Sequence, residues 1–199
     1  MQQTDQVIQL LQSQGIIRPR DLADYGISRA VLYDLLEQGL VMRTGRGLYM
    51  LADTDFTEHH SLAEVCKRVP HGVVCLLSAL RFHNLGTQNP HAVWLAIDHK
   101  ARRPQLDYPP LTIVHFSGAA LSEGIEQHQI EGVTVSVYNK AKTVADCFKY
   151  RNKIGLDIGL EALRECLTTR QSTYQELWQY AKICRVSNVM RPYLEAMTI

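Results

Sequence analysis

Hydrophobic positions in the first fifty residues repeat at helical spacing, and glycines interrupt them. Val7 and Leu11 fall on one side of a predicted first helix, which ends at Gly15. A second helix is predicted over residues 19–25, because proline is favoured at the first helical position, and Gly26 then ends it. Both predicted helices are short.

A third helix is predicted between Ser28 and Gly39. The Ser28 hydroxyl is placed to cap it, since a serine before a helix accepts a hydrogen bond from a backbone N–H that has no partner within the helix. One face of this helix is apolar and carries Val31, Leu32, Leu35 and Leu36. The other face carries mainly Arg29, Ala30, Tyr33, Asp34 and Glu37.

Two β-forming runs follow, Leu40–Arg43 and Gly47–Leu51, and Thr44–Gly47 joins them. Glycines at a tight turn between such runs predict a β-hairpin. Three helices and a hairpin within residues 1–52 predict a winged helix-turn-helix domain, in which Gly26–Ser28 links the second helix to the third.

In such a domain the third helix would enter the major groove of DNA with its N-terminal side chains leading. Arg29 and Tyr33 are the predicted base-reading residues, with Ala30 beside them and Ser28 near phosphate. Arginines at four further positions are expected to contact DNA. Arg43 and Arg46 on the hairpin would hold phosphates or the minor groove, and Arg18 and Arg20, near the start of the second helix, are lesser candidates for phosphate.

Charge leaves a second interpretation open for this segment. Residues 1–52 hold five basic and five acidic side chains, and Asp34 and Glu37 share the predicted recognition face. These carboxylates would repel phosphates unless they accept hydrogen bonds from bases such as cytosine. DNA binding is the favoured prediction, and a protein-interaction adaptor is the alternative.

Residues 53–199 alternate between helical and extended patterns. Ser61 and Glu64 have capping-box spacing and predict a helix that ends before Pro70. A further helix is predicted over Leu76–His83, and strands over Ala92–Ile97, Leu111–Phe116 and Val133–Tyr138. The last helices are predicted over Lys142–Lys149, Leu156–Leu167, Thr173–Cys184 and Pro192–Met197, with Leu156, Leu160, Leu163 and Leu167 as a core-facing stripe.

The predicted fold class is therefore α+β: an N-terminal winged helix-turn-helix followed by a mixed α/β domain with a helical tail. At 46% hydrophobic residues the chain is rich enough in apolar side chains to bury a core. Its five cysteines are spread out and are expected to be buried free thiols, and no apolar stretch has the length of a membrane helix. These features predict a cytoplasmic protein.

Four motifs follow one another along the chain. They are Gly26-Ile27-Ser28-Arg29 with Leu32, Leu35, Gly39 and Arg46-Gly47-Leu48-Tyr49, then Ser78-Ala79-Leu80-Arg81-Phe82-His83-Asn84-Leu85, Val93-Trp94-Leu95, and Lys142-Thr143-Val144-Ala145-Asp146. Together they resemble the AbiEi-type antitoxins of type IV toxin–antitoxin (abortive infection) systems. Their order and spacing carry the resemblance over nearly the whole chain. Lys142 stands where the family usually has arginine, which keeps the charge but loses the bidentate geometry.

The resemblance implies a repressor that binds double-stranded repeats in its own promoter through the winged helix. It also implies an antitoxin-type C-terminal domain, functionally linked to a nucleotidyltransferase toxin without a stable complex. No cofactor, metal ion or membrane enters this expectation.

An enzyme is the less favoured alternative for the C-terminal part. Asp98-His99-Lys100 at a strand end resembles half of a magnesium nuclease site, but residues 72–96 contain no second carboxylate to share the metal. His59, His60 and His71 lack zinc-site spacing, and the adjacent His59 and His60 are predicted to lie at the surface. We therefore predict no catalytic residue and no metal ligand.

Two basic clusters remain in a chain whose formal net charge is +1. One consists of Lys100, Arg102 and Arg103, and the other of Lys140, Lys142, Lys149, Arg151 and Lys153. Each is interpretable as a secondary nucleic-acid surface or as a solvated, salt-bridged face. The sequence does not decide between these two interpretations.

Overall fold

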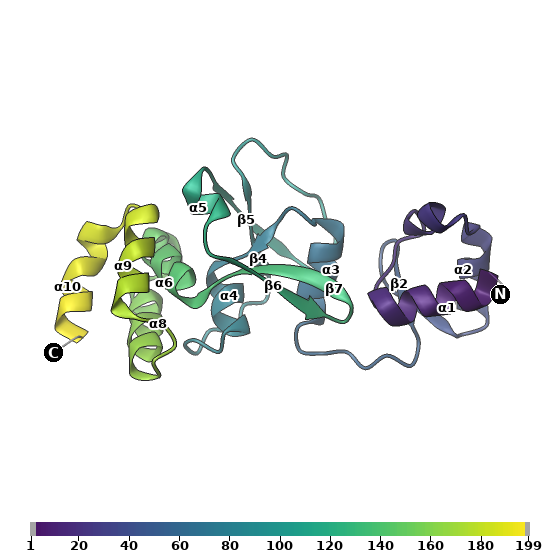
Figure 1. Cartoon of the computed structure of the whole chain (residues 1–199), viewed down its shortest axis with the longest axis horizontal. Coiled ribbons are helices and arrows are strands. Elements are labelled where there is room, and N and C mark those ends of the chain that lie inside the picture. The colour runs from purple at the N-terminus through teal and green to yellow at the C-terminus, as the bar shows by residue number, and fades with distance from the viewer. Residues whose placement is uncertain (1–2, 198–199) are drawn as a thin grey trace. The chain divides into compact units, whose positions relative to one another are not determined.

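The computed structural model describes residues 3–197 and has a mixed α+β architecture (Figure 1). The chain forms two compact units. Unit 1 runs to Pro70 and also includes His128–Val135, whereas unit 2 comprises His71–Gln127 and the chain from Ser136 onward. The boundary predicted after residue 52 falls just beyond the N-terminal hairpin, inside unit 1.

Unit 1 begins with the elements that the sequence predicted, in the predicted order. They are α1 (Gln3–Gln14), η1 (Asp21–Tyr25), α2 (Arg29–Glu37), β1 (Val41–Gly45) and β2 (Leu48–Leu51). The strands pair antiparallel, with Val41 opposite Leu51. Residues 3–52 are called the N-terminal module below.

The second helix of this module is a correction. It is a five-residue 3-10 helix and not an α-helix from Pro19. The Arg18 backbone N–H donates to Asp21 Oδ2 at 3.0 Å, so the chain is still turning at Pro19. Gly26 then ends the helix at φ 66°, and the few residues between Arg20 and Gly26 leave no room for two α-helical turns.

One small core holds the N-terminal module together. Its members come from α1, the two following helices, the segments that connect these helices and the hairpin: Val7, Leu11, Ile17, Leu22, Ile27, Leu32, Leu35, Val41 and Tyr49. Ile17 and Tyr49 exchange backbone hydrogen bonds of 2.9 and 3.0 Å, which join the segment after α1 to β2. The apolar face predicted for the third helix is confirmed, with Leu32 and Leu35 fully buried.

Unit 1 also contains α3 (His60–Arg68), which the sequence predicted, but the capping box predicted for it is wrong. The helix begins before Ser61, with His59 as its N-cap residue and no side-chain cap bond. Ser61 therefore lies within the first turn. Glu64 is 1% exposed and belongs to the buried face of the helix.

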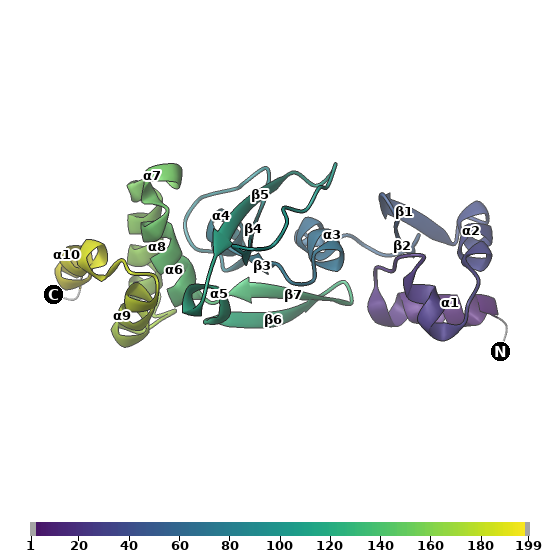
Figure 2. The ribbon, with the colours of Figure 1, turned by 90° about the horizontal axis from the view of Figure 1, so that it is seen from above.

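Most of a mixed five-stranded sheet belongs to unit 2, and its hairpin end at residues 128–135 belongs to unit 1 (Figure 2). Its strands are β3 (Val73–Val74), β4 (Val93–Asp98), β5 (Leu111–Phe116), β6 (Ile125–Ile130) and β7 (Val133–Tyr138), in the order β5-β4-β3-β7-β6. The short β3 pairs antiparallel with β4 and parallel with β7. Strands β4, β5 and β7 confirm the predictions, whereas β3 and the polar β6 were not predicted.

Helices pack on this sheet and continue beyond it in unit 2. They are α4 (Leu76–Phe82), α5 (Ala119–Ser122), α6 (Lys140–Lys149), α7 (Arg151–Ile154), α8 (Leu156–Thr168), α9 (Tyr174–Ile183) and α10 (Ser187–Met197). Helix α6 is the central one and packs against α4, α8 and α9. The short α5 and α7 were not predicted, and α10 begins earlier than expected, with Pro192 inside it.

The leucine stripe predicted for α8 is only partly correct. Leu163 is fully buried, but Leu156, Leu160 and Leu167 are half-buried at the edge of the core. The buried face of α8 consists of Ile158, Gly159, Ala162, Leu163 and Cys166. Small residues face inward because the helix lies close to α6, where Phe148 is 3.5 Å from the position that a Gly159 Cβ would occupy.

The five cysteines are free and buried, as the sequence predicted. Within residues 3–197, the structure contains no helix with the length and apolarity needed to cross a membrane.

Candidate nucleic-acid interface

Helix α2 presents a polar face that its own caps and core fix in place. Ser28 Oγ accepts a hydrogen bond from the Ala30 backbone N–H at 3.3 Å, which confirms the predicted cap. Leu32 and Leu35 anchor the opposite side in the core. Arg29 and Ala30 are exposed as a result, and both belong to the first turn of the helix.

Tyr33 lies one turn after Arg29 and is 44% exposed. Its ring meets the ring of Tyr49 edge to face, with centroids 6.2 Å apart and planes at 63°. Because Tyr49 is 6% exposed and belongs to β2, this contact joins α2 to the hairpin. Tyr33 is therefore held on one side and open to solvent on the other.

The β1–β2 hairpin carries two exposed arginines. Arg43 Nε donates a hydrogen bond to the Gly45 carbonyl at 3.1 Å, so this side chain lies along the end of its own strand. Arg46 occupies the turn next to Gly47. The φ of Gly47 is 70°, and a Cβ added to this glycine would meet no atom within 4 Å. A positive φ of this kind suits glycine at a tight turn.

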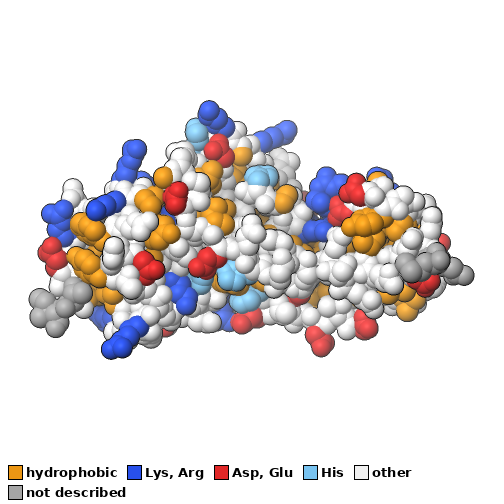
Figure 3. All heavy atoms as spheres, viewed as in Figure 1, with side chains coloured by type: hydrophobic (Ala, Val, Ile, Leu, Met, Phe, Trp, Pro, Cys, Tyr) orange, Lys and Arg blue, Asp and Glu red, His pale blue; other side chains and the backbone are white. Residues whose placement is uncertain are grey.

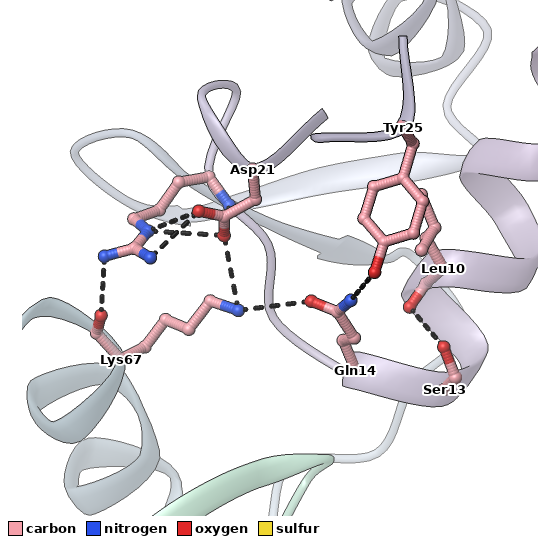
Figure 4. Close-up of polar contacts among 7 residues, drawn as sticks. Leu10, Ser13, Gln14, Asp21, Tyr25 and Lys67 are labelled. Carbon is pink, nitrogen blue, oxygen red and sulfur yellow. Dashed lines mark hydrogen bonds and ion pairs between the residues drawn. The ribbon is translucent and has the colours of Figure 1, made fainter. Parts of the chain in front are cut away.

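Arg18 and Arg20, the lesser candidates for phosphate contact, have different surroundings. Arg20 is exposed and immediately precedes η1. The Arg18 guanidinium forms an ion pair of 2.9 Å with Asp21 and donates to the Lys67 carbonyl at 3.1 Å (Figure 4). Arg18 thus joins η1 to the end of α3, and a DNA contact would compete with that pairing.

The same cluster extends across α3 and α1 (Figure 4). Lys67 Nζ lies 3.3 Å from Asp21 Oδ2 and 3.5 Å from Gln14 Oε1, and the Gln14 amide donates to the Tyr25 hydroxyl at 3.0 Å. Partial burial raises the pKa of Asp21, but the hydrogen bonds from Arg18 and the positive charges of Lys67 and Arg18 outweigh it and lower the pKa. Sequence reasoning missed this cluster, because nothing in the local pattern pairs residue 21 with residue 67.

Acidic side chains accompany the basic ones on the N-terminal module. Asp34 and Glu37 are exposed on α2, as predicted. The view in Figure 3 shows blue and red side chains close together on this module, next to hydrophobic ones. The electrostatic potential of the surface is therefore mixed, and any preference for nucleic acid must come from where individual arginines lie.

The strand-end triplet that suggested a nuclease forms a local turn. Asp98 Oδ1 accepts a hydrogen bond from the Lys100 backbone N–H at 2.8 Å and lies 3.5 Å from the His99 ring nitrogen. Within residues 3–197, no group of three or more His, Cys, Asp or Glu side chains is placed to hold a metal ion.

One of the paired histidines differs from its prediction as a surface residue. The side chain of His60 is 19% exposed, and its Nδ1 lies 2.6 Å from Glu131 Oε2. His60 Nε2 lies 3.9 Å from Glu64 Oε1 on the same helix. Because His60 begins α3 inside unit 1, the fold covers most of its ring.

The second predicted basic cluster is also corrected, because Lys142 is fully buried and cannot face nucleic acid or solvent. Its Nζ donates to Asp146 Oδ2 at 2.6 Å and lies 4.0 Å from the centroid of the Tyr138 ring. Lys149 and Arg151 donate to the backbone carbonyls of Cys184 and Phe148, respectively. These contacts give three of the five cations structural partners within unit 2.

The other motif residues of unit 2 likewise hold its core. Ser78 Oγ accepts from the Trp94 backbone N–H at 2.9 Å and so joins α4 to β4. His83 Nε2 and Thr143 Oγ1 both lie within hydrogen-bond distance of the Tyr138 carbonyl, at 2.7 and 3.1 Å. The motifs therefore meet where α4, α6 and β7 join.

Comparisons with known proteins bear on both parts of the chain. Residues 5–52 match a protein family described as "Transcriptional regulator, AbiEi antitoxin", which confirms the resemblance over these residues. No curated protein matches the chain. The crystal structure of the RV2827C protein from Mycobacterium tuberculosis is similar, with a TM-score of 0.57 and 12% identity, over 98% of this chain and 80% of that one. At this identity the similarity shows a shared fold.

Proposed function

We propose that this chain, whose residues 5–52 match the AbiEi antitoxin family of transcriptional regulators, is a sequence-specific DNA-binding repressor. In this proposal the N-terminal module works as a winged helix-turn-helix. Helix α2 enters the major groove, and the β1–β2 hairpin acts as the wing on the DNA backbone. The protein acts in the cytoplasm and performs no catalysis of its own.

The observation that carries the proposal is the exposed face of α2 beside the arginine-bearing hairpin. Arg29 and Tyr33 lie one turn apart on that face, and the Tyr33–Tyr49 contact fixes the helix relative to the hairpin. An arginine at the start of a recognition helix can donate two hydrogen bonds to guanine, whereas arginines on a wing pair with phosphates. Ser28 caps α2 and Ala30 lies in its first turn, whereas Arg20 is an exposed residue before η1.

We further propose that the operator is a set of repeats in the protein's own promoter. The C-terminal unit would counteract a nucleotidyltransferase toxin without forming a stable complex with it. This part rests on the family match to residues 5–52, which describes an antitoxin. Co-expression of the chain with a growth-inhibiting nucleotidyltransferase toxin tests it, because neutralisation is expected to restore growth without co-purification of the two proteins.

A gel-shift titration tests the DNA-binding function. The probe is DNA from immediately upstream of the gene, and scrambled DNA of the same length and composition is the competitor. A shift that persists at about 150 mM salt and resists the scrambled competitor is expected, because nonspecific phosphate contacts weaken steeply with salt. A shift that scrambled DNA removes equally well would favour the protein-interaction adaptor instead.

Two substitutions separate base contacts from backbone contacts. Arg29→Ala is expected to cost about 1–3 kcal/mol on the operator and little on scrambled DNA, because a base contact is lost. Arg46→Ala is expected to weaken binding to both DNAs and to reduce the salt dependence, because a phosphate contact is lost. An equal loss on both DNAs for Arg29→Ala would remove its base-reading role.

A further inference from the structure

We propose that the turn of the β6–β7 hairpin is a positioning element for DNA binding by the N-terminal module, with Glu131 as its central residue. This inference rests on the proposed function. The turn consists of Glu131 and Gly132 and belongs to unit 1, although it lies far along the sequence from the N-terminal module. The inference depends on side-chain contacts, on a backbone contact and on the connection of both to the β1–β2 hairpin.

Glu131 has an unusual backbone conformation and a fully engaged side chain. Its φ is 49° and that of Gly132 is 74°, as in the two-residue turns that connect antiparallel strands. Such a φ is uncommon for a glutamate and costs conformational energy. Asparagine and glycine adopt such a φ more readily, and either would be sufficient if residue 131 only had to form a turn. We infer that the side chain of Glu131 has a separate role.

That role is a set of short polar contacts with the segment that leads into α3. Glu131 Oε1 accepts hydrogen bonds from the Thr57 backbone N–H and from Thr57 Oγ1, both at 2.8 Å, and Oε2 lies 2.6 Å from His60 Nδ1. Burial raises the pKa of Glu131, but the contacts with His60 and Thr57 outweigh it and lower the pKa. The carboxylate is therefore held in its charged form against α3.

The backbone of the turn also interlocks with the end of α1. A Cβ on Gly15 would lie 1.5 Å from the Glu131 carbonyl oxygen, and a Cβ on Gly132 would lie 2.4 Å from the Gln14 carbonyl carbon. Two glycines with positive φ therefore allow the two backbones to touch. Any side chain at either position would push the turn away from α1.

Both contacts lead to the β1–β2 hairpin. Helix α3 continues from His60 to Glu64 and Arg68, and these two side chains pack against Gly45 of β1. A Cβ added to Gly45 would lie 2.9 Å from Glu64 Oε1 and 2.2 Å from Arg68 Nη2. From Gly15, the chain continues to Ile17, which exchanges hydrogen bonds with Tyr49 of β2. The β6–β7 turn thus supports β1 through α3, and it supports β2 through the end of α1.

The consequence is a coupling between the β6–β7 hairpin and DNA affinity. When the turn contacts α3 and the end of α1, these two segments hold the β1–β2 hairpin in one position, and the arginines of the hairpin are pre-organised to contact phosphate. When these contacts are lost, the hairpin gains conformational entropy, which DNA binding must then remove. Glu131 and Gly132 are positioning residues in this account, because neither is proposed to touch DNA.

The first test compares Glu131→Ala with the matched control Glu123→Ala, which removes an exposed carboxylate before β6. Operator affinity of the full chain is measured by titration, and hydrogen exchange of residues 41–51 is measured without DNA. Glu131→Ala is expected to weaken operator binding by about fivefold or more and to speed exchange in the hairpin. Glu123→Ala is expected to change neither. Glu131→Gln keeps an oxygen that can accept from Thr57 and should restore part of the affinity.

The second test uses two glycines with similar backbone strain. Gly132→Ala and Gly86→Ala both place a side chain at nearly the same positive φ, 74° and 73°, but a Cβ at Gly86 would approach the end of the Glu161 side chain, at 3.2 Å, whereas a Cβ at Gly132 would clash with backbone. The melting temperatures of the two variants should therefore fall by amounts that reflect their common strain, with a larger fall for Gly132→Ala. Loss of operator affinity is expected for Gly132→Ala alone.

Normal affinity and normal hairpin exchange in Glu131→Ala would overturn the positioning role. Equal effects of the two glycine variants would also overturn it. If the wild-type chain fails to bind operator DNA, the proposed function falls, and hydrogen exchange in residues 41–51 still decides whether the turn supports the hairpin.

Discussion

Each unit of the molecule contains an aspartate paired with a lysine, and the two pairs differ in their access to water. In unit 1, Asp21 has 16% of its side chain exposed and is shared between Arg18 and Lys67. In unit 2, Asp146 is 1% exposed, and its partner Lys142 is fully buried against aromatic rings. Cys184 completes the second site by donating its thiol to Asp146 Oδ1 at 3.2 Å.

The pKa values of the two aspartates move in opposite directions. Burial dominates at Asp146 and raises its pKa, although Lys142, Cys184 and Lys149 offset part of that effect. At Asp21 burial is weaker, and the cationic partners lower the pKa. An ion pair that keeps contact with water stabilises its charges at little cost, whereas a buried pair depends on each partner to compensate the desolvation of the other.

The largest effect is expected from breaking the buried pair on one side. Lys142→Ala leaves Asp146 in the core without its cation and should destabilise unit 2 by about 3–5 kcal/mol. Urea unfolding followed by tryptophan fluorescence measures this, because Trp94 and Trp178 both belong to unit 2. Lys140→Ala, two residues earlier, is the control and should cost far less. A loss below about 1 kcal/mol for Lys142→Ala would contradict the pairing.

Removing both charges should cost much less than removing one. Lys142→Met with Asp146→Leu replaces the pair by apolar side chains of similar size, and such replacements are often neutral or stabilising. The double variant is therefore expected to recover most of the stability lost in the single variant by the same urea measurement. If the double variant loses as much stability as the sum of the losses measured for Lys142→Met and Asp146→Leu separately, the two residues do not act as a pair.

A smaller effect is expected at the hydrated pair. Asp21→Asn keeps the shape of the side chain but removes the charge that Arg18 and Lys67 share, and should cost about 1 kcal/mol. Differential scanning calorimetry measures the loss, with Asp24→Asn on the same 3-10 helix as the control. A loss as large as that of Lys142→Ala would show that exposure does not separate the two sites.

Lowering the pH should affect the stability of the two units differently. Asp21 and Glu131 have pKa values below 3.8 and 4.5, respectively, so their stabilising contributions are present above those values and are lost as pH falls through the lower, folded-state values. Asp146 has a raised pKa, so its contribution does not decrease in acid. NMR amide signals of unit 1 should therefore lose dispersion at a higher pH than those of unit 2. The reverse order would contradict the assignment.

How much the sequence predicts depends on how local each feature is. The helix caps and glycine stops around α2 act between neighbouring residues, so Ser28, Gly26 and Gly39 were sufficient to place that helix. Strands β4, β5 and β7 follow from runs of β-branched and aromatic residues. The polar strand β6 has no such run, and its place beside β7 comes from the turn that connects the two strands.

The features that sequence reasoning missed are pairings over long distances along the chain. The sequence groups Lys142 with the neighbouring surface cations, because its charge is visible in the sequence and its burial is not. His60 was placed at the surface for the same reason, and Glu131, which covers it, lies far along the chain. The predicted DNA-contacting residues Arg29, Tyr33, Arg43 and Arg46 remain predictions, placed on exposed surface by the fold.

The most direct test of the account is the ratio of operator affinity to scrambled-DNA affinity, measured by titration at about 150 mM salt for the wild-type chain and for Arg29→Ala. The account predicts a ratio of about 10³ or more for the wild type and a fall of about 5- to 100-fold in Arg29→Ala. A wild-type ratio near one, or a ratio that Arg29→Ala leaves unchanged, would contradict it.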